Sequence, residues 1–154
     1  MNESSLSILA EGPNETMAVG RRLAALLRPG DIILLTGRLG SGKTLFAAGL
    51  AEGLGVDELV TSPSFVLVNS YRGFMPFTHA DVYRLGSSAE FDDLELPAEA
   101  ADGVLAIEWG DAIAARVPPD HLVVRIDIME GDRRRILVSP MGSWAARPLR
   151  ELTE

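Results

Sequence analysis

Cysteine is absent from the 154-residue sequence. Without it the chain cannot form disulfides, hold zinc or an iron–sulfur cluster through thiolates, or use a thiol as a nucleophile. Long apolar runs are also missing, because runs such as residues 32–35 fall far short of the roughly 20 residues of a transmembrane helix. No basic N-terminal segment precedes an apolar stretch, so we expect a cytoplasmic protein without a signal peptide or a membrane association.

Positive charge is scarce as well. The chain has 14 Lys and Arg residues against 22 Asp and Glu residues, which gives a net charge of −8. Affinity for nucleic acids and anionic membranes comes mainly from Lys and Arg, so general binding to either is disfavoured. Lysine occurs only once, as Lys43, beside 13 arginines.

The length and the 47% content of hydrophobic residues fit one globular domain covering residues 1–154. Short apolar runs, which suit buried strands, alternate with helical patterns. Strands are expected at 6–10, 31–36, 65–71, 77–83 and 104–107. Helices are expected from residue 13 to before Pro29, over 43–54, from Ser87, over 111–117 and in part of 144–154. The pattern predicts an α/β fold, with a mixed, mostly parallel sheet flanked by helices and a C-terminal antiparallel hairpin over 121–138.

A glycine-rich loop of the phosphate-binding type lies between the second strand and the second helix. Residues 37–44 match the motif G-x-x-x-x-G-K-[ST] without a gap. Glycines let the backbone curl so that its N–H groups face phosphate, and the helix N-terminus adds positive partial charge. Lys43 offers a charge to the β- and γ-phosphates, and Thr44 offers a hydroxyl to Mg²⁺. We therefore expect a single P-loop NTPase domain.

The expected nucleotide is ATP. GTPases read guanine with an N-K-x-D motif, and the only lysine already lies in the loop. The dinucleotide fingerprint G-x-G-x-x-G is incomplete, because Leu45 stands in place of its last glycine. The residues expected to bind the nucleotide belong to the loop and to the first turn of its helix: Gly37, Gly40, Ser41, Gly42, Lys43, Thr44 and Leu45.

Two acids follow expected strands. Glu108 ends the apolar run 104–107, and Asp81 ends the weaker run 77–80. Ligands of open α/β sheets bind at the carboxyl ends of the strands, so both acids are expected to face the loop. Either one can hold the metal or orient the attacking water, and a plain surface acid is the alternative for each. His79 shares a strand face with Asp81 and is expected to have a structural or positioning role.

Three other segments leave alternatives open. The hydroxyls of residues 61–65 fit either a switch that reaches Mg²⁺ and the γ-phosphate or an ordinary turn. The basic cluster 133–135 favours a solvated hairpin tip over a site for phosphate or an acidic partner. Trp109 either packs against the protein or lies near the nucleotide.

Taken together, these segments resemble the TsaE family, the ATPase of bacterial tRNA threonylcarbamoyladenosine (t6A) biosynthesis. The similar features are the loop, Ser-Pro-Ser-Phe at 62–65, the run at 79–85, Ile-Glu-Trp at 107–109 and the closing hairpin. Glu15, Thr16 and Gly20 are similar to the first helix of the family. The loop alone is generic, but this combination in this order is specific.

The resemblance implies a Mg²⁺-dependent P-loop ATPase in which Lys43, Asp81 and Glu108 form the catalytic set. Lys43 would bind phosphate, Thr44 and Glu108 would ligate Mg²⁺, and Asp81 would lie at the nucleotide. Residues 62–65 would form the switch. The family works with a TsaB–TsaD pair, in which TsaD transfers threonylcarbamoyl to tRNA and the ATP cycle of TsaE resembles a reset between turnovers. Contact with tRNA would be indirect, through the complex, in agreement with the acidic charge.

Three residues depart from the family pattern. Arg38 stands where an acidic residue is usual, so nucleotide affinity or hydrolysis rate is expected to differ. Ser41 replaces the commoner alanine, and Ser64 replaces the usual threonine while keeping its hydroxyl. None of the three changes removes a necessary group.

Two other functions fit the residues. A small-molecule kinase is compatible with the loop and the size, with Arg84 and the cluster 133–135 recruited as a lid. A non-catalytic module that reads the nucleotide state and docks a partner is the second, although two acids near the phosphates argue against it. A partner-dependent ATPase is expected to be slow alone, because groups supplied in trans raise such rates by about 10³–10⁵.

Overall fold

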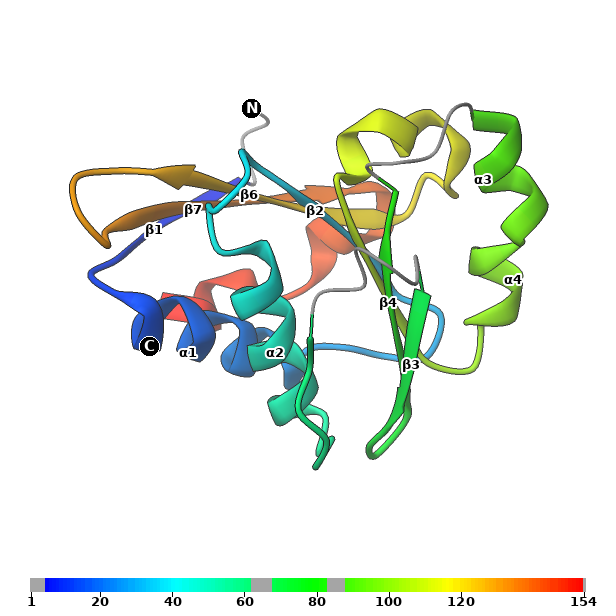
Figure 1. Cartoon of the computed structure of the whole chain (residues 1–154), viewed down its shortest axis with the longest axis horizontal. Coiled ribbons are helices and arrows are strands. Elements are labelled where there is room, and N and C mark those ends of the chain that lie inside the picture. Colours follow the sequence, from blue (N-terminus) through cyan, green and yellow to red (C-terminus); the bar gives the residue numbers. More distant parts are fainter. Residues whose placement is uncertain (1–4, 62–67, 83–87, 154) are drawn as a thin grey trace.

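The structure is a computed structural model that describes residues 5–61, 68–82 and 88–153. In these ranges the chain forms one seven-stranded sheet with the order β1-β7-β6-β2-β5-β4-β3 (Figure 1). The strands are β1 (Leu6–Ala10), β2 (Ile32–Thr36), β3 (Val68–Arg72), β4 (Pro76–Asp81), β5 (Val104–Glu108), β6 (His121–Ile128) and β7 (Arg134–Met141). Only β3 and β7 run against the other strands, so the sheet is mixed and mostly parallel, as predicted.

Short helices connect and cover the strands. The α-helices are α1 (Pro13–Ala24), α2 (Lys43–Gly53), α3 (Ser88–Leu94) and α4 (Leu96–Glu99). The 3₁₀ helices are η1 (Gly110–Arg116), η2 (Gly142–Ala146) and η3 (Leu149–Thr153). In Figure 1, α1 and α2 lie together on one side of the sheet with the C-terminus near α1, and α3 and α4 lie on the other side. No helix in the described ranges has the length and apolar character needed to cross a membrane.

The core consists of two layers, one on each face of the sheet. On β2, Ile33 and Leu35 pack in the layer that holds α1, α2 and the C-terminal 3₁₀ helices. Ile32 and Leu34 pack in the other layer, with residues of α3, α4 and η1. Successive side chains of a strand point to opposite faces, so a strand covered on both sides needs a continuous apolar run. This is why the run at 31–36 lies at the centre of the sheet.

Close packing of α1 on α2 depends on glycine. A Cβ atom at Gly49 of α2 would lie 2.1 Å from the carbonyl oxygen of Met17, and one at Gly20 of α1 would lie 2.5 Å from that of Phe46. Such distances are well inside van der Waals contact, so larger residues would force the two helices apart. Since α2 begins at the phosphate loop, this packing fixes the direction in which the loop enters the helix.

Most expected elements are confirmed, and the hairpin forms between β6 and β7 as predicted. The helix expected at 111–117 is a 3₁₀ helix, and the expected helical tail is divided into η2 and η3 around Pro148. Helix α4 was not expected from the sequence; it follows Glu95, which has a left-handed φ of 51°. The starts expected at residue 65 for β3 and at Ser87 for α3, and the end expected at residue 83 for β4, lie outside the described residues.

On the second face, α3 is joined to η1 by an ion pair between Arg116 and Asp92, with Nε donating to Oδ1 at 3.2 Å. The hydrogen bond from Arg116 lowers the pKa of the Asp92 carboxyl. Both side chains are about half exposed, so the pair is expected to add little to stability.

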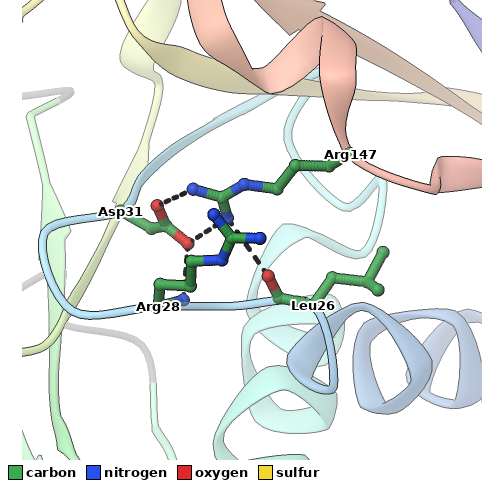
Figure 2. Close-up of polar contacts among 4 residues, drawn as sticks. All are labelled: Leu26, Arg28, Asp31 and Arg147. Atoms are coloured by element: carbon green, nitrogen blue, oxygen red, sulfur yellow. Dashed lines mark hydrogen bonds and ion pairs between the residues drawn. The ribbon is translucent and has the colours of Figure 1, made fainter.

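A buried ion pair fastens the C-terminal tail to the start of β2 (Figure 2). Arg147 donates from Nη1 and Nη2 to the two carboxylate oxygens of Asp31, at 2.5 and 2.6 Å. Asp31 also accepts the backbone N–H of Arg28 at 2.7 Å, and Arg147 donates to the carbonyl of Leu26 at 3.1 Å. The guanidinium lies 3.8 Å from the ring centroid of Trp144. The side chains of Arg147 and Asp31 are only 11% and 7% exposed, so each charge needs the other.

We expect Arg147→Ala to lower the free energy of unfolding by about 3 kcal/mol, because it leaves the Asp31 carboxylate buried without its main partner. Urea unfolding followed by circular dichroism measures the loss. Arg150→Ala is the matched control, since Arg150 lies exposed in the same tail and should change stability little. A midpoint for Arg147→Ala equal to that of Arg150→Ala would contradict the role given to the ion pair.

Candidate functional site

The glycine-rich loop leaves the carboxyl end of β2 and enters α2 in a backbone conformation that favours glycine. Gly37, Gly40 and Gly42 have φ values of +139°, +80° and +112°, in the region that other residues rarely adopt. At Gly37 a Cβ would also lie 2.5 Å from the carbonyl oxygen of Ile126 on β6. The loop therefore curls tightly above the end of the sheet, and its three glycines are favoured by conformation, while Gly37 is required by space as well.

Lys43 is enclosed by the loop that it follows. Its Nζ donates to the carbonyl oxygens of Gly37 and Arg38, at 2.8 and 3.0 Å. It also lies 4.0 Å from the ring centroid of Trp109, a distance typical of a cation–π contact. Lys43 is only 5% exposed, and these contacts hold its ammonium against the loop. The loop thus presents a fixed positive charge.

Glu108 lies at the end of β5 and joins the loop helix to β4. Its Oε2 accepts a hydrogen bond from Thr44 Oγ1 at 2.8 Å. The same oxygen lies 2.6 Å from Nε2 of His79, which is fully buried. An ionised carboxylate only accepts, so with Glu108 ionised His79 donates from Nε2. Within the described residues Nδ1 of His79 has no hydrogen-bond partner, so the imidazole is held chiefly by Glu108.

Asp81 lies beside Glu108, because β4 and β5 are parallel and pair these two residues directly. The backbone N–H of Val82 donates to the carbonyl of Glu108 at 3.2 Å and so continues the pairing past the end of β4. Both acids are largely buried, with Asp81 7% and Glu108 4% exposed. Two carboxylates thus face the same loop from neighbouring strands, as the sequence predicted.

These groups surround a hollow of about 250 Å³ at the carboxyl edge of the sheet. Its lining comes from the loop, the first turn of α2, the two acids and the neighbouring tryptophan: Leu39, Gly40, Gly42, Lys43, Thr44, Leu45, Asp81, Glu108 and Trp109. A second hollow of about 130 Å³ lies on the other side of the loop and shares Gly40, Gly42 and Leu45 with the first. The loop therefore separates two adjoining spaces.

Trp109 helps to close the first hollow. It has a left-handed φ of 65°, which is uncommon for a residue with a Cβ. Its backbone N–H donates to the carbonyl of Leu35 at 2.8 Å, which extends the pairing of β5 with β2. The turn brings the indole against Lys43, so Trp109 both packs against the protein and lines the first hollow, and the two alternatives left open by the sequence are not exclusive.

The arginine cluster of the hairpin does not act as one unit. Arg133 pairs with Glu11, with Nε 3.1 Å from Oε2, and Arg135 is exposed. Arg134 donates from Nε to the carbonyl oxygen of Ser41 at 3.0 Å and lines the second hollow. The sequence did not single out Arg134, because residues 93 positions apart give no local signal of contact.

The structure brings most of the predicted site residues together around the two hollows, and Gly37 lines neither of them. Lys43, Thr44, Asp81 and Glu108 all line the first hollow. Ser41 of the loop is fully buried and lines the second hollow. Arg38 is exposed, and its side chain lies outside the lining of both hollows. Residues 62–65 of the expected switch and Arg84 lie outside the described residues.

The donors at the site fit a magnesium ion that arrives with a phosphate ligand. The Thr44 hydroxyl and the Glu108 carboxylate are hard oxygen donors, which Mg²⁺ prefers. Among the described residues no group of three or more His, Asp or Glu side chains is placed to hold a metal. Magnesium usually takes only one or two protein ligands and completes its shell with phosphate oxygens and water.

Comparison with known proteins gives one family. The model of the family described as "Threonylcarbamoyl adenosine biosynthesis protein TsaE" matches residues 10–136. A Streptomyces coelicolor protein named tRNA threonylcarbamoyladenosine biosynthesis protein TsaE is 43% identical over 136 residues, covering 82% of this chain and 92% of the relative. A Bacillus subtilis protein of the same name is 38% identical over 133 residues, covering 85% of this chain and 83% of the relative.

A solved structure is similar over nearly the whole fold. The crystal structure of Bacillus subtilis YdiB matches with a TM-score of 0.79 and 33% sequence identity, covering 97% of this chain and 94% of that one. The likeness extends over the α/β sheet and the helices that flank it. The chain therefore belongs to the TsaE family of tRNA threonylcarbamoyladenosine biosynthesis proteins.

Proposed function

We propose that this protein is a Mg²⁺-dependent ATPase that serves t6A modification of tRNA together with a TsaB–TsaD pair. The observation that carries the proposal is the set of groups around one hollow: the Lys43 ammonium, the Thr44 hydroxyl and two buried carboxylates. This set supplies charge for phosphate, a ligand for Mg²⁺ and an acceptor for a proton of water. Membership of the family supplies the biological process.

Each group has a separate task in this proposal. The backbone of the loop and Lys43 bind the β- and γ-phosphates, as in other phosphate loops. Thr44 and Glu108 hold Mg²⁺, which neutralises charge on the phosphates when it is bound. Asp81 lies beside Glu108 and is placed to orient the attacking water. His79 holds the Glu108 carboxylate in place through its hydrogen bond at 2.6 Å.

The rest of the nucleotide also has space. The second hollow adjoins the first across Gly40, Gly42 and Leu45, and it is lined by Pro13 and Thr16 of α1. A ligand whose phosphates fill the first hollow can extend past the loop into the second. This supports a nucleoside triphosphate over free phosphate as the ligand, and the single lysine supports ATP over GTP for the reason given above.

The partner assignment is supported by the scarcity of positive charge on the chain. Its net charge of −8 makes it a poor tRNA binder, so tRNA would be held by the TsaB–TsaD pair. We also place this protein in the cytoplasm, in agreement with the expectation from the sequence. The kinase alternative has less support, because Arg133 and Arg134 are already engaged with Glu11 and Ser41. No observation favours a non-catalytic module.

We expect Lys43→Ala to lower ATP hydrolysis at least 100-fold, on the order of the loss of a main charge-stabilising group in other enzymes. Because the lysine binds ground-state phosphate as well, ATP affinity should fall too. Glu108→Gln keeps the size of the side chain and should retain ATP binding while losing hydrolysis. Phosphate release and calorimetric titration measure the two effects. Wild-type hydrolysis in both variants would overturn the site assignment.

The hydroxyl of Thr44 is expected to set the magnesium dependence. Thr44→Ala removes the oxygen and should raise the Mg²⁺ concentration for half-maximal hydrolysis by about tenfold or more, the range seen when support for a metal is lost. Thr44→Ser is the matched control, because it keeps the hydroxyl and loses only a methyl group. A Mg²⁺ titration of hydrolysis for the three proteins measures this. Equal magnesium requirements for Thr44→Ala and Thr44→Ser would count against Thr44 as a ligand.

Partner dependence gives the third test of the proposal. Hydrolysis by the pure protein should be slow. Addition of the TsaB–TsaD pair should raise the rate by up to about 10³, the lower end of the effect of groups supplied in trans in other enzymes. Steady-state phosphate release with and without the pair measures the stimulation, and Lys43→Ala shows that it depends on the loop. Equal rates with an active pair and without it would argue against a partner-dependent ATPase.

A further inference from the structure

The hairpin between β6 and β7 reaches the phosphate loop through one side chain. Arg134 is the first residue of β7, and its Nε donates to the carbonyl oxygen of Ser41 at 3.0 Å. Its Nη1 donates to the carbonyls of Gly131 and Arg133 at 3.0 and 2.8 Å. The turn of the hairpin thus holds the guanidinium in place, and Nε is left directed at the loop.

The contact fixes the peptide that joins Ser41 to Gly42. In a trans peptide the C=O and the following N–H point in opposite directions. Arg134 lines the second hollow and is outside the lining of the first, while Gly42 lines both. A Ser41 carbonyl held toward Arg134 therefore turns the N–H of Gly42 toward the first hollow, where phosphate is expected to bind.

The backbone on either side of this peptide is held, because Ser41 N–H donates to the carbonyl of Arg38 at 3.0 Å and Phe46 N–H donates to that of Gly42 at 2.9 Å, but these bonds do not hold the Ser41–Gly42 peptide itself. Gly42 has a φ of +112° and carries no side chain that would restrict its rotation. The neighbouring Ser41 side chain gives no help, since its buried Oγ has no hydrogen-bond partner among the described residues. Rotation of the peptide would place a carbonyl oxygen, which repels phosphate, where an N–H donor is needed.

We infer that Arg134 is a positioning residue for phosphate binding, which acts through the Ser41–Gly42 peptide rather than by touching the phosphates. This rests on the proposed function, because it assigns Arg134 to the same phosphate site. It also explains how the closing hairpin, which contributes no lining to the first hollow, takes part in the site.

Substitutions at Arg134 distinguish a hydrogen bond from a charge. Arg134→Gln keeps an N–H donor bonded to Cδ, where Nε stands, and removes the positive charge. Arg134→Lys keeps the charge and moves the donor one carbon farther along. Arg134→Ala removes both. Arg135→Ala is the matched control, because it deletes one positive charge from an exposed neighbour on the same strand.

The first readout is the dissociation constant of ADP with Mg²⁺, measured by calorimetry. Arg134→Ala is expected to weaken binding about tenfold, as for loss of one charge-assisted hydrogen bond, and Arg134→Lys should remain weak. Arg134→Gln should recover most of the affinity, and Arg135→Ala should bind as the wild type does. Recovery by lysine and not by glutamine, or wild-type binding by Arg134→Ala, would overturn the inference.

The second readout uses the protein without nucleotide. The amide resonance of Gly42 in ¹⁵N-labelled protein should shift in Arg134→Ala and Arg134→Lys and return in Arg134→Gln. An unchanged Gly42 amide in Arg134→Ala would overturn the inference. If the wild type binds no ADP, the proposed function fails, and the Gly42 amide alone still decides whether Arg134 orients the loop. Thermal melts of each variant separate these effects from a loss of folding.

Discussion

A single carboxylate oxygen, Oε2 of Glu108, is the point at which three parts of the chain meet. It accepts the Thr44 hydroxyl from the start of α2, lies within hydrogen-bond distance of His79 on β4, and belongs to the last residue of β5. Because Glu108 is 4% exposed, both contacts form in a setting where unpaired charge is costly. The position of the loop relative to the sheet therefore depends on this oxygen. In the proposed function, the acid would share a magnesium ion with Thr44 at the same place.

The order of the strands explains why the site assembles at this edge. Strand β2 lies between β5 and β6, so the loop that leaves it passes above both neighbours. On one side, Glu108 and Trp109 follow β5 and close the hollow. On the other side, Ile126 of β6 lies under Gly37, and Arg134 of β7 holds Ser41. The ion pair between Arg147 and Asp31 lies at the opposite end of β2, where it stabilises the fold and takes no part in the site.

Local signals in the sequence were sufficient for the loop and the strands. The motif at 37–44 defines its own chemistry, and the apolar run at 104–107 followed by Glu108 predicts an acid at the edge of a parallel sheet. The contact of His79 with Glu108 could be expected only in part, because strand alternation gives its face but not the register of β4 on β5. The ion pairs of Arg133 and Arg147 and the contact of Arg134 with Ser41 join distant segments. Nothing local distinguishes these arginines from solvated ones, so only the fold reveals their partners.

The most direct test is the crystal structure of the protein with Mg²⁺ and a non-hydrolysable ATP analogue. If the loop is a phosphate site of the kind described, the β- and γ-phosphates should lie in the hollow between Lys43 and Glu108, with Mg²⁺ bound to Thr44 Oγ1. The N–H of Gly42 should point at a phosphate oxygen. Density for the analogue elsewhere, or a metal held away from Thr44 and Glu108, would contradict the assignment of this edge of the sheet as an ATPase site.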